Sequence, residues 1–289
     1  MVEIGAGPHS VVSFGNPAAM TFREATAQIA ACDYEHLMVL GSEKGPPLDK
    51  AGDAPAAFVN LMESDPAALL KSVSGFGLRV SCVYPGCPLD YSAEGVKPTV
   101  ERLLRYRETI RALGCHVMCL SVSGARRPGM PFEEKREAVA RVAEVIDAVA
   151  SDEPGDLFKV GIDIHYGAIV ETVADCEYLL ERCGNTNAGL CLNMGHLSSA
   201  KQDGWTLLEK YPGRVHIVAW KDHKVPEDGS RPWVSVRLGD GLTQLEKYVA
   251  AWKSSGCLGV HLITVEHEPP ERKAAALRES LQYLRGMGV

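Results

Sequence analysis

The chain has 289 residues and a formal net charge of −7, and 46% of its residues are hydrophobic and 23% charged. These values are typical of soluble enzymes. An acidic chain without a basic block is a poor nucleic-acid binder, because phosphate contacts supply most of that affinity. No apolar run approaches the ~20 residues that span a bilayer, and the N-terminal segment lacks the features of a signal peptide. We therefore predict a cytoplasmic protein with no nucleic-acid or membrane partner.

The chain contains nine cysteines, an odd number. No close pair of them repeats with the spacing of a zinc site. Several lie in apolar runs such as CHVMCL and GLCL, where a thiol packs as a small hydrophobic group. This pattern predicts reduced cysteines in the core of a cytoplasmic protein.

Short apolar segments alternate with longer segments of helical periodicity. Residues 132–150, for example, carry apolar side chains at i, i+3, i+4 and i+7, which predicts an amphipathic helix. Continuous apolar strands joined by helices indicate a parallel sheet, and eight such units favour a closed barrel. We predict one α/β domain over residues 1–289, a single (β/α)8 TIM barrel with a long loop at 225–241 after strand seven. The predicted strands are 9–15, 36–41, 79–84, 116–123, 159–165, 188–193, 215–220 and 259–266.

The predicted fold indicates where the site lies. In such barrels the catalytic residues come from the C-terminal strand ends and the loops after them. The first half of the chain offers Tyr84, Ser121, Ser123 and the pair Arg126 and Arg127, which more simply forms a solvated loop. The second half is richer, with Asp163, His165, Asn193, His196, Lys221, Asp222, His223, Glu266, His267 and Glu268.

Strand alternation sorts these residues by face. Glu266 shares its face with Leu262 and Thr264 and is expected to meet polar partners at the barrel mouth, because a lone buried carboxylate is costly. Trp220 and Trp233 carry aromatic faces that suit a ring-shaped substrate, although alternation leaves a core position open for Trp220. The remaining histidines are expected to pack in the core or to bond the backbone, and they are His9, His36, His116, His216 and His261.

Four predicted strands, in chain order, each end in a distinctive group of polar residues. The segments are VGIDIHYG, GLCLNMGHL, RVHIVAWKDHK, and VRLGDG followed by VHLITVEHEPP. In order, they are similar to a Glu-Asn-His segment, an Asp with a His three residues later, a His-x-Lys-Asp ending and a G-x-G … I-E-H-E ending. Together they resemble the xylose isomerase-like TIM barrels, which include sugar phosphate isomerases and epimerases. The resemblance covers roughly residues 100–285 and does not specify a substrate.

The resemblance implies one divalent metal, Mn²⁺ or Mg²⁺, held by a Glu, an Asp, a His and a Glu on strands five to eight. In this chain those positions carry Asp163, Asn193, Ala219 and Glu266. A hard cation prefers carboxylate oxygen, so the loss of one charge and one ligand weakens binding. A metal held by the three remaining ligands, with His165 or His223 in the vacant place, is one alternative. A weak site, or none, is favoured.

Proton transfer remains open to these residues without a metal. Asp163 and Glu266 are candidates for general acid and base, with His165 as an auxiliary group. His196 and Lys221 are candidates for polarising a substrate oxygen. Crowded carboxylates raise one pKa, which suits proton transfer near neutrality. The candidates for substrate binding are Asn193, Trp220, Asp222, His223 and Tyr84.

We therefore expect an isomerase- or epimerase-like enzyme that acts by proton transfer on a carbonyl-bearing sugar, polyol or sugar-derived compound. Two alternatives stay open. One is a metal-independent lyase, dehydratase or cyclase on the same barrel, and the other is a non-catalytic binding subunit that has lost its metal site. The expected partner is a small-molecule substrate, and pairing into a homodimer is compatible with a barrel of this size.

Overall fold

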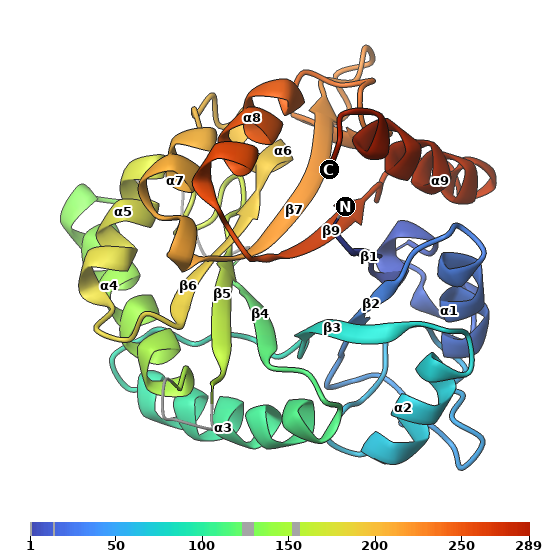
Figure 1. Cartoon of the computed structure of the whole chain (residues 1–289). Coiled ribbons are helices and arrows are strands. Elements are labelled where there is room, and N and C mark those ends of the chain that lie inside the picture. Colours follow the sequence, from blue (N-terminus) through green and yellow to red (C-terminus); the bar gives the residue numbers. More distant parts are fainter. Residues whose placement is uncertain (1, 14, 123–129, 152–156) are drawn as a thin grey trace.

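The structure is a computed structural model that describes residues 2–13, 15–122, 130–151 and 157–289 (Figure 1). Ser123, Arg126 and Arg127, considered above for the barrel mouth, lie outside these residues. In the described ranges, no helix is both long and apolar enough to cross a membrane.

Within the described part of the chain, eight parallel strands close into a barrel (Figure 1). The strands follow chain order around it, and the pairing of the last parallel strand with the first completes the circle. This arrangement confirms the predicted (β/α)8 barrel. The strands are β1 (Ile4–Ala6), β2 (His36–Leu40), β3 (Arg79–Tyr84), β4 (Val117–Ser121), β5 (Lys159–Asp163), β6 (Ala188–Asn193), β7 (Val215–Lys224) and β9 (Val260–Thr264).

Helices surround the barrel on its outer side (Figure 1). The apolar stripe predicted within residues 132–150 is buried in the structure, including Val139, Val142 and Ile146. Burial of such stripes against the strands forms the core outside the barrel. The helices are α1 (Phe22–Ala30), α2 (Pro66–Ser74), α3 (Val96–Ala112), α4 (Phe132–Val149), α5 (Val173–Arg182), α6 (Met194–Ser199), α7 (Trp205–Lys210), α8 (Leu245–Ser255) and α9 (Pro270–Gly286).

Local sequence signals fix several helix ends. Thr21 and Thr172 precede α1 and α5, and each forms a capping box with an acidic residue three positions later, Glu24 and Asp175. These reciprocal hydrogen bonds satisfy backbone N–H groups that the first helical turn leaves free. Gly256 ends α8 with a φ of +69°, a left-handed conformation that glycine adopts without strain.

The first strand lies earlier in the chain than the predicted 9–15. β1 is only three residues long, and Gly5 leaves room for the close approach of β2, since a Cβ there would meet the Cβ of His36 at 2.9 Å. Pro8 then begins a 3-10 helix, η1 (Pro8–Ser10), because proline fixes φ and lacks an N–H for a strand ladder. As a result, His9 follows a strand end and lies at the barrel mouth.

The predicted loop at 225–241 contains a strand of its own. β8 (Val234–Val236) pairs antiparallel with the end of β7, so that Lys224 faces Val234 and Asp222 faces Val236. The end of β7 and β8 therefore form a hairpin that rises beyond the barrel. This hairpin carries Trp233 to the cavity described below.

Candidate active site

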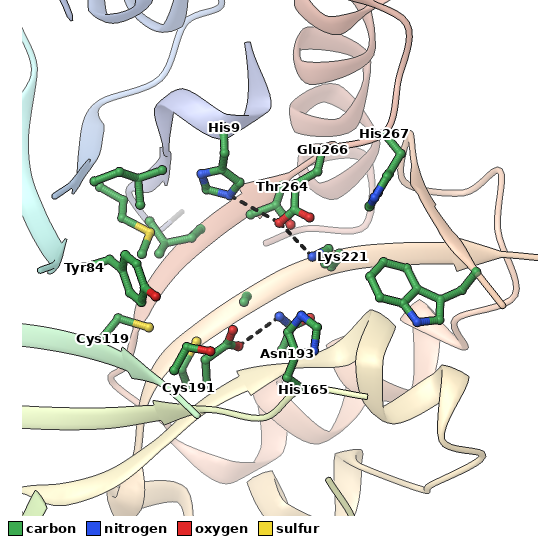
Figure 2. A pocket seen from close by; sticks show the side chains of 17 residues that line it. His9, Tyr84, Cys119, His165, Cys191, Asn193, Lys221, Thr264, Glu266 and His267 are labelled. Atoms are coloured by element: carbon green, nitrogen blue, oxygen red, sulfur yellow. Dashed lines mark hydrogen bonds and ion pairs between the residues drawn. The ribbon is translucent and has the colours of Figure 1, made fainter. Parts of the chain in front are cut away.

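The C-terminal strand ends enclose a cavity of about 420 Å³ (Figure 2). Such a volume lies within the range of about 300–1,000 Å³ that is typical of small-molecule sites. The cavity is lined by His9, Met38, Leu40, Tyr84, Cys119, Ser121, Asp163, His165, Cys191, Asn193, Ala219, Lys221, Trp233, Leu262, Thr264, Glu266 and His267.

A buried ion pair lies at the centre of the cavity. Lys221 on β7 is 2% exposed, and its Nζ donates a hydrogen bond to Oε1 of Glu266 at 2.8 Å. The same Nζ lies 3.3 Å from Nε2 of His196. Burial is the largest single influence and opposes ionisation of Glu266, but the charge and hydrogen bond of Lys221, together with His9 and His267, hold the pKa of Glu266 below its ordinary value. The cavity therefore contains a fixed cation against an ionised carboxylate.

Two residues outside the main strands hold this pair in place. Lys273, near the start of α9, donates to the backbone oxygen of Glu266 at 2.5 Å and to that of His9 at 3.2 Å. His9 Nε2 in turn lies 3.7 Å from Oε1 of Glu266 (Figure 2). Burial lowers the pKa of His9 to about 4, so its ring is neutral at pH 7. His9, which was expected to pack in the core or to bond the backbone, is buried and also lines the cavity.

A second carboxyl lies on β5. Oδ1 of Asp163 accepts a hydrogen bond of 2.9 Å from the Asn193 side-chain amide on β6. Burial, and after it the charge of the neighbouring Cys119, raise the pKa of Asp163 to about 7, with the Asn193 amide and the Lys221 ammonium acting in the opposite direction. The raised pKa therefore favours the protonated form of Asp163 near neutral pH, while the lowered pKa keeps Glu266 ionised. The two carboxyls have opposite pKa shifts.

Imidazole rings surround Trp233 at the outer side of the cavity. The Trp233 ring stacks on His223 at 4.1 Å between centroids, and it meets His196 edge to face at 4.5 Å. The rings of His165 and His196 lie 3.6 Å apart. Burial lowers the pKa of His165, His196 and His267, and that of His223 to about 2. These rings are therefore neutral at pH 7 and accept or donate hydrogen bonds without adding charge.

The structure brings most of the predicted site residues together. His196 contacts the set through Lys221 and His165. Sequence reasoning did not place Cys119, Cys191 and Thr264 in the site, and strand alternation at β4, β6 and β9 is the signal for all three. The predicted catalytic and binding residues that line the cavity are Tyr84, Asp163, His165, Asn193, Lys221 and Glu266.

Three predicted substrate-binding residues lie elsewhere. Trp220 is fully buried on the opposite face of β7, where its Nε1 donates to Nδ1 of His261 at 2.9 Å. Asp222, on the same face, accepts backbone hydrogen bonds of 2.8–3.0 Å from residues 239, 241 and 243. His223 lies behind Trp233, with Nδ1 2.8 Å from Oγ of Ser199. Their assignment to substrate binding is corrected, because strand alternation turns Trp220 and Asp222 away from the cavity and Trp233 covers His223.

A family model described as "Xylose isomerase-like TIM barrel" matches residues 27–287. The chain belongs to this family. Solved xylose isomerase-like barrels share its fold at low identity. A xylose isomerase domain protein from Alicyclobacillus acidocaldarius is 17% identical with a TM-score of 0.68, covering 99% of this chain and 98% of that one. A D-allulose 3-epimerase from Methylomonas sp., in complex with D-allulose, is 16% identical with a TM-score of 0.71, covering 99% and 97%.

Two inosose dehydratases from Clostridium perfringens, from strain ATCC 13124 and strain 13, are similar in sequence to this chain. Each is 24% identical over 208 residues, which is 64% of this chain and 67% of the relative. These relatives are enzymes, and this xylose isomerase-like barrel is similar to them over most of its length.

The metal implied by the resemblance does not fit the residues of this xylose isomerase-like barrel. Ala219 has no ligand atom, and Asn193 directs its amide N–H at Asp163. Glu266 is already paired with the Lys221 ammonium. His223, one of two candidates for the vacant place, is held by Trp233 and Ser199. Among the described residues, no group of three or more His, Cys, Asp or Glu side chains is arranged to hold a metal ion.

Proposed function

We propose that this chain is an enzyme that moves a proton on a carbon next to a carbonyl group, in a hydroxy-ketone derived from a sugar or polyol. The observation that carries the proposal is the pair of cavity carboxyls with opposite pKa shifts, Glu266 and Asp163, on either side of the Lys221 ammonium. Two carboxyls whose surroundings separate their pKa values are a common basis for acid and base roles.

Glu266 is the general base in this proposal. It is ionised at neutral pH, and its carboxylate borders the cavity. Removal of a proton from the carbon next to a carbonyl leaves negative charge on the carbonyl oxygen. Lys221 is a buried cation beside Glu266, and a cation positioned in advance stabilises such an oxyanion more strongly than water does. The neutral His196 ring beside the ammonium is a further hydrogen-bonding group for that oxygen.

Asp163 is the general acid. With a pKa raised to about 7, it keeps a proton available near neutrality. Donation of that proton to the opposite face of the same carbon completes an epimerisation. Donation to the former carbonyl carbon, with a proton passing from the neighbouring hydroxyl to the former carbonyl oxygen, completes an isomerisation. Donation to a hydroxyl group on the next carbon instead breaks the C–O bond and releases water, which completes a dehydration. His165 lines the cavity as a neutral ring and is the auxiliary group in either case.

Dehydration is the second candidate reaction, and the two inosose dehydratase relatives favour it. Both reactions begin with the same proton removal, so one experiment tests them together. A non-catalytic binding subunit is less well supported, because binding alone does not require two carboxyls with separated pKa values.

The test is hydrogen exchange in D2O, followed by NMR on a panel of ketohexoses, inososes and 2-hydroxycyclohexanone. We expect the wild-type enzyme to exchange the proton next to the carbonyl of at least one compound. Glu266→Gln should lower that rate by about 10²-fold or more, since general bases contribute about 10²–10⁴. Glu271→Gln, an exposed carboxyl in the first turn of α9, is the matched control and should exchange like wild type. An unchanged rate in Glu266→Gln would refute the assignment.

A further inference from the structure

Opposite walls of the cavity differ in their chemistry. Asp163, Asn193 and Lys221 project from β5, β6 and β7. Met38 and Leu40 project from β2, which lies four strands from β6 in either direction around the barrel. The polar wall and the apolar wall therefore face each other across the full width of the cavity.

The inner end of the cavity continues the apolar wall. Leu262, Ala219 and Cys191 lie there as buried, small or aliphatic side chains. Each lies two positions before a polar residue on the same face of its strand, namely Thr264, Lys221 and Asn193. Each therefore lies deeper in the barrel than that residue. On the β2 side, Tyr84 adds one hydroxyl beside an aromatic ring (Figure 2). A ligand that reaches this region meets mainly hydrocarbon and thiol groups, with few hydrogen-bond partners.

The polar wall offers a limited number of hydrogen bonds. Lys221 and Glu266 are paired with each other, and Asn193 is paired with Asp163. Among the described residues, two buried side-chain oxygens of the lining have no partner, Oδ1 of Asn193 and Oγ1 of Thr264. Thr264 is in register with Lys221, so both oxygens lie on the side of the ion pair. A buried polar group without a partner is unfavourable, so these two oxygens call for ligand groups along the edge that faces the ion pair.

We infer that the cavity selects a cyclic hydroxy-ketone whose oxygens lie along one edge and whose opposite edge is hydrocarbon, rather than a ring hydroxylated on every carbon. The inference rests on the proposed function for the orientation of the carbonyl toward Lys221. The oxygenated edge meets Lys221, Asn193 and Thr264, and the hydrocarbon edge packs on Met38 and Leu40. A fully hydroxylated ring would press its remaining hydroxyls against these two side chains, where they lose their hydrogen bonds to water without replacement.

The test compares two rings that share the same α-hydroxy-ketone edge. The ligands are 2-hydroxycyclohexanone and 2,3,4,5,6-pentahydroxycyclohexanone, and their Kd values are measured by ligand-observed NMR titration. We expect the first to bind on the order of tenfold more tightly, from burial of its hydrocarbon edge. Leu40→Asn should reduce or reverse this ratio, because it puts an amide on the apolar wall. Leu40→Met keeps an apolar side chain of similar size and should preserve the ratio.

Three results would overturn the inference: tighter or equal binding of the pentahydroxy ring, no binding of either ring, or a ratio unchanged in Leu40→Asn. Thermal denaturation of both variants shows whether they fold. Hydrogen exchange on the same ligands separates this inference from the proposed function. Binding with the predicted ratio but no exchange refutes the function and leaves the selectivity, whereas exchange with the opposite ratio refutes only the selectivity.

Discussion

Glu266 and Asp163 line one cavity, yet their pKa values shift in opposite directions. Both are partly buried, and burial alone raises the pKa of a carboxyl. Their neighbours differ, since Glu266 has a direct ammonium contact at 2.8 Å, whereas Asp163 has a neutral amide at 2.9 Å and the charge of Cys119, which raises its pKa further. At the scale of single residues, these different neighbours separate the pKa values of two similar carboxyls.

This division predicts a pH dependence. Asp163 acts as an acid only while protonated, and its pKa is raised to about 7, so kcat/KM should fall as the pH rises above about 7. The general base causes no change in kcat/KM between pH 5 and 7, because the pKa of Glu266 is lowered and its carboxylate stays ionised in this range. The profile is measured from pH 5 to 9 by the exchange assay. Asp163→Asn should remove the fall with rising pH together with most of the activity, and a wild-type rate that rises through pH 8 would contradict the assignment.

At the scale of elements, the hairpin of β7 and β8 depends on one buried carboxylate. Asp222 accepts hydrogen bonds from the backbone N–H groups of Gly239, Gly241 and Thr243. Gly241 is needed for this approach, because a Cβ there would stand 2.2 Å from Asp222 Oδ1. Asp222 thus fixes the segment between β8 and α8, and the hairpin carries Trp233 to the cavity.

Asp222→Ala should lower the free energy of unfolding by about 1–3 kcal/mol, because it removes the shared acceptor of three backbone N–H groups, of which that of Thr243 is buried. It should also increase amide hydrogen exchange in residues 233–243. Asp228→Ala changes an exposed aspartate of the same loop and should leave both unchanged. Equal unfolding midpoints and equal exchange in the two variants would show that Asp222 does not hold the loop.

The elements also show what the sequence could predict. Seven of the eight barrel strands follow from apolar runs. Alternation along β7 accounts for the inward Lys221 and for the outward Trp220, against the assignment of Trp220 to substrate binding. β1 was missed because three residues with a glycine and an alanine carry little local signal. The contact of His9 with Glu266 joins residues from the two ends of the chain. It depends on closure of the barrel between β1 and β9, which no local pattern reports.

At the scale of the whole molecule, several histidines are buried as neutral rings. Burial lowers the pKa of His9, His216 and His261 to about 4 and that of His223 to about 2. The unfolded chain protonates its histidines near pH 6.5, so between pH 6.5 and 4 it binds more protons than the native state. Stability is therefore lost as the pH falls. Asp163 opposes this trend, because its raised pKa makes the native state bind a proton that the unfolded chain does not bind in this pH range. It is one group against the four histidines.

We expect the free energy of unfolding to fall between pH 7 and pH 5, by up to about 1.4 kcal/mol per pH unit for each such histidine. Urea denaturation at intervals of half a pH unit measures the slope. His216→Asn removes one of these four histidines at a position that does not line the cavity. It should reduce the slope of the free energy of unfolding against pH. If the free energy of unfolding of the wild-type protein stays constant or increases as the pH falls from 7 to 5, these rings are protonated in the native state.

We propose that the Lys221 ammonium, rather than a divalent metal, is the cation of this cavity. The direct measurement is the exchange rate in D2O after chelator treatment and desalting, with metal content determined by elemental analysis. We expect well below one equivalent of metal per chain and an undiminished exchange rate. We also expect a loss of about 10²–10³-fold in Lys221→Met, the usual effect of removing an oxyanion donor, and none in the exposed control Lys224→Met. About one equivalent of retained metal, with activity lost to chelator and restored by Mn²⁺, would contradict this proposal.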